Sequence, residues 1–177
     1  TLISFIASGN MQNIQNGVEC AFGDVKVPAF VNLNRLTCLT PKMDSAGVSA
    51  LKMLRSDGSI MAENLPFEFY SSPVFTHAEP SSSSELGGKS IYIVADGTID
   101  LWSNVTCMFG NAFTYGRYVS SSLVSCTVPM HSPGSVVLRV SLNGYDYSTV
   151  SSPFLFSHHA TVSRVVPSVV LSSGESI

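Results

Sequence analysis

The residues best suited to do chemistry are four cysteines, which occur as two pairs along the 177-residue chain. Cys20 and Cys38 are 18 residues apart, and Cys107 and Cys126 are 19 residues apart. A zinc site would need close Cys-x-x-Cys spacing or companion histidines, and neither accompanies these pairs. We therefore predict two disulfides, Cys20–Cys38 and Cys107–Cys126, which imply an oxidising compartment.

The remaining polar residues give no basis for catalysis. A nucleophilic serine needs an oriented histidine beside it, and the sequence contains no G-x-S-x-G turn. His158 and His159 are adjacent, so on a strand they would point to opposite faces and could not bind one ion together. The segment Asp96–Asp100 lacks the dense oxygen ligands of a calcium loop and is interpreted as a turn. We predict a protein that is not an enzyme, with no metal site and no cofactor.

Asn104 is the acceptor residue of the only N-x-S/T sequon in the sequence. Because the predicted disulfides indicate the secretory pathway, we predict that Asn104 carries a glycan. A sugar-binding or partner-binding surface is one interpretation of the aromatic residues Trp102, Tyr115, Tyr118, Tyr145 and Tyr147. Ordinary packing of β-strands accounts for most of them.

Charge is sparse in this sequence. Charged residues make up 12% of the chain, about half of the usual share, and the formal net charge is -3. The nine Lys and Arg residues are scattered, which argues against a nucleic-acid partner. No apolar run approaches the roughly 18 residues needed to span a bilayer, because the best candidate, Val162–Leu171, is broken by Arg164 and Pro167.

The sequence repeats itself with a period of about 87 residues. Val18–Gly23 matches Val105–Gly110, which places Cys20 and Cys107 87 positions apart. Further matches at 87 or 88 positions are Leu36–Pro41 with Val124–Pro129, Pro66–Phe69 with Pro153–Phe156, and Pro80 with Pro167. The chain therefore holds two tandem repeats with one cysteine pair each.

Each repeat is predicted to consist of short strands, because no segment keeps a helical period for three turns. Ser90–Ala95 is rich in β-formers, and Val136–Leu142 precedes Asn143-Gly144, a strong hairpin signal because both residues tolerate positive φ. The first repeat has Leu51–Arg55 before Asp57-Gly58 at the equivalent place. We predict an all-β chain of two sandwiches, each with about seven strands.

Four motifs of the second repeat carry a family resemblance. They are Cys107-x-Phe-Gly, Val124-x-Cys-x-x-Pro, the stretch Ser141–Ser148 and Pro153-Phe-x-Phe. With these motifs the chain resembles the IPT/TIG domain family, although the first repeat has Arg-Ser-Asp-Gly-Ser in place of Ser-Leu-Asn-Gly. The resemblance implies immunoglobulin-like sandwiches in tandem, as in extracellular regions of plexin-like, hepatocyte-growth-factor-receptor-like and fibrocystin-like proteins, and in some transcription factors. It implies a fold and a surface setting, but no single ligand.

The two ends of the sequence complement each other. Thr1–Ile6 aligns with Lys89–Val94, so the first repeat lacks a counterpart of Val74–Pro80, while Ala160–Ile177 matches that segment without a repeat after it. We therefore expect a sandwich lacking its first strand at residues 1–72, a complete sandwich at 73–157, and a strand at 158–177 that completes another repeat.

An open sandwich exposes an unpaired edge, which proteins avoid. The four residues Ser157–Ala160 reach about 14 Å, whereas a typical strand makes a domain about 20 Å long, so closure within one chain is difficult. We expect the C-terminal strand of one copy to enter the first repeat of another, head to tail. The predicted acceptor edge contains Leu2, Ile3, Phe5 and Ile6, and the predicted assembly strand contains Val162, Val165, Val166, Pro167, Val169, Val170 and Leu171.

Three functions are compatible with these features. The first is a secreted structural subunit of an extracellular fibre, a homopolymer whose partners are other copies of itself. The second is part of a longer cell-surface receptor or adhesin with many repeats, which binds protein or carbohydrate. The third is a carbohydrate-binding accessory module, for which glycans would be the partners.

Overall fold

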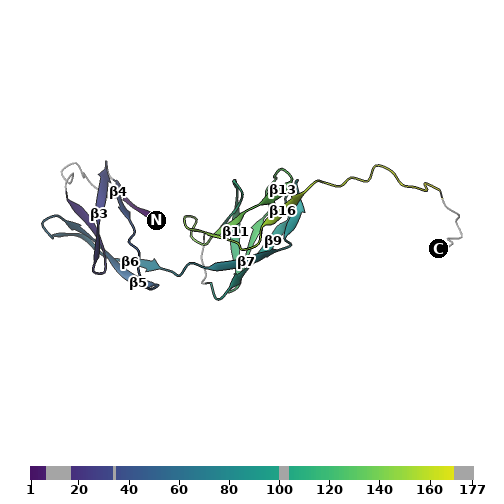
Figure 1. Ribbon diagram of the computed structural model, residues 1–177. Helices are drawn as coiled ribbons and strands as arrows, with labels where there is room; N and C mark the ends of the chain where they lie inside the picture. Colours follow the sequence, from purple (N-terminus) through teal and green to yellow (C-terminus); the bar gives the residue numbers. More distant parts are fainter. Residues whose placement is uncertain (7–16, 34, 100–103, 170–177) are drawn as a thin grey trace. The chain divides into compact units, whose positions relative to one another are not determined.

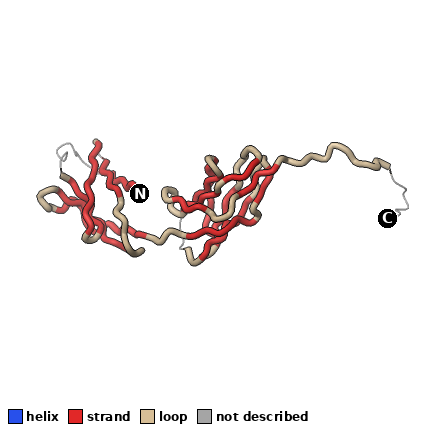
Figure 2. Tube along the Cα trace, in the orientation of Figure 1, coloured by secondary structure: helices blue, strands red, loops and turns tan. Residues whose placement is uncertain are grey.

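The computed structural model describes residues 1–6, 17–33, 35–99 and 104–169. These residues form strands, turns and loops, as Figure 2 shows, so the described part of the chain offers no helix that could cross a membrane. The chain divides into two compact units, Thr1–Ser72 and Pro73–Ile177, which we call the first and the second repeat (Figure 1). The prediction of an all-β chain is confirmed.

The described residues of the first repeat form six strands in the order β1-β4-β3-β2-β5-β6, with antiparallel neighbours throughout. Their alternating burial reflects side chains that point by turns toward the core and toward solvent. The strands are β1 Leu2–Ile6, β2 Val18–Phe22, β3 Val25–Asn32, β4 Arg35–Leu39, β5 Gly47–Arg55 and β6 Ile60–Phe69.

Strand β3 passes from one layer of the first repeat to the other. Its residues 25–28 pair with β2, whereas residues 29–32 pair with β4. The disulfide Cys20–Cys38 joins β2 to β4 across this transition, with a Cα–Cα distance of 6.4 Å. Both cysteines are fully buried in a core that includes Phe22 and Leu51. The first predicted disulfide is therefore confirmed.

Ten strands are found in residues 73–99 and 104–169 of the second repeat. Seven follow the order β15-β14-β10-β11-β12-β9-β7, and three form a smaller sheet in the order β13-β16-β8. The sub-order β14-β10-β11-β12-β9 reproduces β5-β2-β3-β4-β1 of the first repeat. The strands are β7 Val74–Glu79, β8 Ser82–Ser84, β9 Ser90–Asp96, β10 Thr106–Phe109, β11 Ala112–Ser120, β12 Leu123–Thr127, β13 Gly134–Val136, β14 Leu138–Ser141, β15 Tyr147–Thr149 and β16 Phe154–Ser157.

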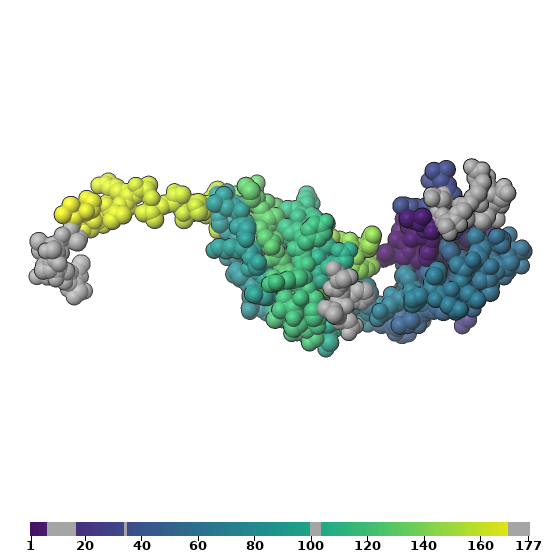
Figure 3. Space-filling view, turned by 180° about the vertical axis from the view of Figure 1, so that it is seen from behind, coloured from purple at the N-terminus to yellow at the C-terminus, as the bar shows by residue number. Residues whose placement is uncertain are grey.

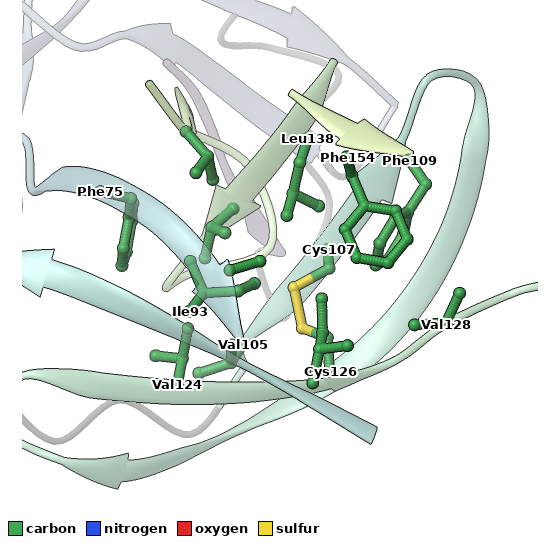
Figure 4. Packing of buried hydrophobic residues seen from close by; sticks show 14 of the residues in the cluster. Phe75, Ile93, Val105, Cys107, Phe109, Val124, Cys126, Val128, Leu138 and Phe154 are labelled. Carbon is green, nitrogen blue, oxygen red and sulfur yellow. A yellow bond between two sulfur atoms is a disulfide. The ribbon is translucent and has the colours of Figure 1, made fainter. Parts of the chain in front are cut away.

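The core of the second repeat surrounds its own disulfide. Strand β11 pairs with β10 and then with β12, and Cys107–Cys126 joins those two strands with a Cα–Cα distance of 6.3 Å. Figure 4 shows this bridge among apolar side chains from several strands, including Ile93, Phe109 and Leu138. The second predicted disulfide is confirmed as well.

Two expectations about the strands of the second repeat are wrong. The described part of the second repeat has ten strands rather than about seven, partly because the counterparts of β5 and β6 are each divided in two, whereas the six described strands of the first repeat are close to the expected number. The run Val136–Leu142 is not a single strand, since β13 pairs with β16 whereas β14 pairs with β10. The hairpin predicted at Asn143-Gly144 is confirmed, because β14 and β15 pair antiparallel on either side of a loop, residues 142–146, in which Asn143 Oδ1 accepts hydrogen bonds from the backbone N–H groups of residues 145 and 146.

Candidate strand-acceptor site

A short segment at the start of the second repeat pairs with two different sheets. Strand β7 pairs antiparallel with β9, and strand β8 pairs parallel with β16. Pro80 lies between β7 and β8, at the point where the chain leaves one sheet for the other. Proline suits this position because it has no amide hydrogen to contribute to a continuous ladder. The segment β7–β8 therefore closes one side of the second repeat.

The segment β7–β8 contributes both side chains and backbone groups to the second repeat. Phe75, Ala78 and Ser83 are buried, with exposed fractions of 0%, 5% and 8%. The backbone N–H of Leu155 donates to the carbonyl of Ser81 at 3.1 Å, and the N–H of Glu85 donates to the carbonyl of Ser157 at 2.8 Å. Further bonds run from the N–H groups of residues 151 and 152 to the carbonyls of residues 75 and 76.

The first repeat has the same two edges without this segment. Strand β1 corresponds to β9, since Ile3 pairs with Cys38 as Ile91 pairs with Cys126. The second half of β6 corresponds to β16, since Phe67 and Phe69 match Phe154 and Phe156 at the period of 87. Within residues 1–6, 17–33 and 35–72, β1 pairs with β4 alone and β6 with β5 alone. We call these two outer edges the acceptor site.

Side chains at the acceptor site are incompletely covered. Ile3 and Phe5 on β1 are half-buried, whereas Ile91 and Ile93, which match them in the second repeat, are fully buried. The predicted acceptor residues thus divide into two classes, because Leu2 and Ile6 on the same strand are 57% and 77% exposed.

An aromatic triangle shows the same contrast on the other edge. In the second repeat the rings of Phe109, Phe154 and Phe156 contact one another edge to face, with centroids 5.1 to 6.0 Å apart, and all three are buried. Phe22, Phe67 and Phe69 form an equivalent triangle in the first repeat, with centroids 5.1 to 5.8 Å apart. Its two members on β6, Phe67 and Phe69, are only half-buried.

A shallow hollow of about 390 Å³ lies at the end of the β6 edge. It is lined by residues 43–46 and 69–72. In the second repeat the equivalent loop holds His131, whose backbone N–H donates to the carbonyl of Glu85 just after β8. The hollow therefore lies where the residues after β8 pack in the second repeat.

The predicted assembly strand is not paired with any described part of the chain. Residues 158–169 are extended and exposed, and are drawn in yellow in Figure 3. Val162 and Val165 are 88% and 69% exposed, Val166 and Val169 are 70% and 83% exposed, and Pro167 is also exposed. Val170 and Leu171 lie outside the described residues. Donation of this strand to another copy stays a prediction.

Sequence reasoning identified β1 as an acceptor edge but missed the β6 edge. The signal was present, because Pro66–Phe69 was matched to Pro153–Phe156. That match did not indicate that the aromatic pair on β6 borders the same opening as β1, which follows only from the pairing of β8 with β16.

The other candidate residues do not gather into one site. His77 Nε2 lies 3.0 Å from a carboxylate oxygen of Glu79, and the ring of His131 stacks on Phe156. The His158 ring and the His159 backbone N–H both contact the Glu85 carboxylate.

The aromatic candidates are also dispersed. Tyr118 packs on the core, Tyr147 hydrogen-bonds Thr106, and Tyr115 contacts Phe113. Tyr145 is exposed, and Trp102 lies outside the described residues. Gly97 bends the chain after β9, and Asp100 also lies outside the described residues.

The sequon is accessible at its acceptor atom. Asn104 is exposed, and one hydrogen of its side-chain Nδ2 is donated to the carbonyl of Asn143 at 3.2 Å. A glycosylated asparagine keeps one amide hydrogen, so a glycan and this bond are compatible.

We expect protein from a eukaryotic secretory host to lose the mass of one N-glycan when Asn104 is replaced, as in Asn104→Gln. Intact-mass spectrometry before and after enzymatic deglycosylation measures the difference. Thr106→Ser is the control, because it preserves the sequon and the hydroxyl that bonds Tyr147. An unmodified Asn104 peptide in mature protein contradicts the prediction.

These features define a class of tandem, disulfide-containing β-sandwich proteins. The chain is built from two β-sandwiches that each contain one internal disulfide and share a common strand order. Residues 73–158 match the family model described as the IPT/TIG domain. The second repeat thus matches the IPT/TIG domain family, and the predicted resemblance is confirmed.

The chain is similar in sequence or fold to parts of two much longer proteins. The chain is 27% identical over 137 residues to fibrocystin-L of Mus musculus, an alignment that covers 77% of this chain and 3% of that protein. Its fold is similar to the structure of the plexin A4 full extracellular region, domains 1 to 10, with a TM-score of 0.58 and 13% identity. That match covers 94% of this chain and 15% of the plexin chain, and it shows the immunoglobulin-like fold alone.

Proposed function

We propose that this chain is a non-catalytic structural segment of an extracellular protein built from tandem IPT/TIG repeats. The observation that carries the proposal is the repetition of one strand order around one buried disulfide in each repeat. Disulfides of this kind persist in oxidising compartments. The similarity to fibrocystin-L and to the plexin extracellular region supports a place on the cell surface or outside it.

The repeats are joined into a larger structure in one of two ways. In the first, they belong to a longer receptor or adhesin in which neighbouring repeats follow along the same chain. The relatives favour this form, since the chain spans only 3% of fibrocystin-L and 15% of the plexin A4 chain. In the second, separate subunits form a fibre through donated C-terminal strands, and the uncovered edges of β1 and β6 favour it.

A denaturing, reducing gel of native source material tests the proposal and separates its two forms. An antibody against this chain is expected to detect it in the surface-biotinylated or secreted fraction. A band far above 18.9 kDa indicates a long array, and a band near 18.9 kDa, allowing for glycan, indicates a fibre subunit. Detection only in the cytosolic, reduced fraction contradicts the proposal.

A further inference from the structure

We infer that the acceptor site of the first repeat binds residues 161–171 of a second copy of this chain, in the register that β7–β8 adopts in the second repeat. This inference deepens the second form of the proposed function, the fibre of separate subunits, and rests on that form for its biological setting. The second repeat supplies the geometry, because it contains the same site already filled. Three independent features of the sequence fit residues 161–171 to that geometry.

The first feature is the shared spacing of one proline and one glycine. Pro167 lies 87 positions after Pro80, at the point where the chain must cross between sheets. Gly174 lies 87 positions after Gly87, whose φ is +62°. A side chain at Gly87 would also overlap the backbone of Pro129, so both the positive φ and the lack of space require glycine at this position. The segment 161–174 thus contains both special residues that β7–β8 and its following turn require.

The second feature is compensation of side-chain size. In the second repeat Phe75 and Ala78 of β7 accompany Ile93 of β9 in the core. The matching positions are Val162, Val165 and Phe5, so the large aromatic residue moves from the donated strand to the acceptor strand. The two sets contain nearly the same number of side-chain carbons, and cores tolerate substitutions that conserve total volume.

The third feature is the fate of a buried hydroxyl. Ser83 on β8 is buried, and within the described part of the second repeat its Oγ has no hydrogen-bond partner. The matching residue in the C-terminal segment is Val170, which would place a methyl-bearing side chain there. An apolar side chain avoids the desolvation penalty of an unpaired hydroxyl. Residues 161–171 therefore suit this kind of site at least as well as β7–β8 suits its own.

The register follows from the pairing of β7 with β9. Ala78 lies opposite Ile93 and Glu79 opposite Tyr92, which places Val165 opposite Phe5 and Val166 opposite Ser4. Val165 then points into the core, whereas Val166 takes the place of the exposed Glu79 and points to solvent. These two neighbouring valines are equally exposed in the free segment, at 69% and 70%.

Val165→Glu and Val166→Glu are therefore a matched pair of variants of the full chain. We expect the full chain to associate head to tail in a concentration-dependent manner in sedimentation equilibrium. Val165→Glu should weaken association at least tenfold, because it places a carboxylate in the core, and Val166→Glu should change it less than threefold. Both side chains are largely exposed in the free segment, and circular dichroism and an intact disulfide map verify that the variants fold.

Engineered cysteines test the register directly. Ser4→Cys combined with Val166→Cys is expected to give covalent multimers on a non-reducing gel, since both residues face outward from opposite positions. Ser4→Cys combined with Val165→Cys is the control and should cross-link at least tenfold less, because a shift of one residue reverses the face of a strand. A full chain that stays monomeric, equal effects of the two glutamate variants, or equal cross-linking of the two cysteine pairs overturns the inference. The gel of native material is unaffected by any of these outcomes, so failure here leaves the proposed function standing.

Discussion

Replacing Phe154 with alanine is expected to destabilise the second repeat by about 3–5 kcal/mol, a range typical of fully buried phenylalanines. Its ring is 1% exposed and contacts both Phe109 and Phe156. The matched substitution Phe67→Ala removes the equivalent ring from the first repeat, where it is half-buried. We expect that change to destabilise the first repeat by only about 1–2 kcal/mol, because less area leaves water when the ring packs.

Native-state hydrogen exchange followed by mass spectrometry measures both effects, since peptides from each repeat report on it separately. The measurement should be made at a concentration at which the chain is monomeric. Repeating it at high concentration provides a control, because a strand bound at the acceptor site would raise the effect of Phe67→Ala toward that of Phe154→Ala. If Phe67→Ala and Phe154→Ala destabilise their repeats equally in the monomer, the first repeat is not open at β6.

Removing the disulfide of the second repeat is expected to destabilise it by about 3 kcal/mol in the chain-entropy model. The variant combines Cys107→Ala with Cys126→Ala. In the unaltered chain the disulfide between these two buried residues links positions 19 apart. The matched variant combines Cys20→Ala with Cys38→Ala. In the unaltered chain the Cys20–Cys38 disulfide closes a loop of nearly the same length in the first repeat.

Urea unfolding of the two variants and of the unaltered chain gives the comparison. The first repeat starts from a less covered core, so we expect the Cys20/Cys38 variant to unfold that repeat at room temperature while the other variant stays folded. Non-reducing peptide mapping of the unaltered chain should recover both bridges. A loss below about 1 kcal/mol for both variants contradicts the expectation.

Features that depend on local sequence could be predicted. The period of 87, the two cysteine pairs and the strand Ser90–Asp96 are visible in the sequence because each rests on residue type and spacing alone. The match of Pro80 with Pro167 is visible in the same way, and in the structure β7 and β8, on either side of Pro80, pair with different sheets.

Features that depend on distant pairing could not be predicted. Val137 separates β13 from β14 because the two strands have different partners, and nothing in the run Val136–Leu142 indicates where one partner replaces the other. Likewise, Phe67 and Phe69 have the composition of core residues, and their partial exposure depends on a strand that other parts of a sandwich must supply. Strand context decides such positions more than intrinsic preference does.

The parallel pairing of β8 with β16 also determines how the second repeat carries mechanical load. These strands lie near the beginning and the end of the repeat and run in the same direction, so tension between Pro73 and Ser157 slides one along the other. The bonds from Leu155 N–H to Ser81 and from Glu85 N–H to Ser157 are then stretched in shear and must break together. Antiparallel strands joined by a turn would instead open one bond at a time when their free ends are pulled. Tandem repeats of this kind would therefore resist tension applied along the chain.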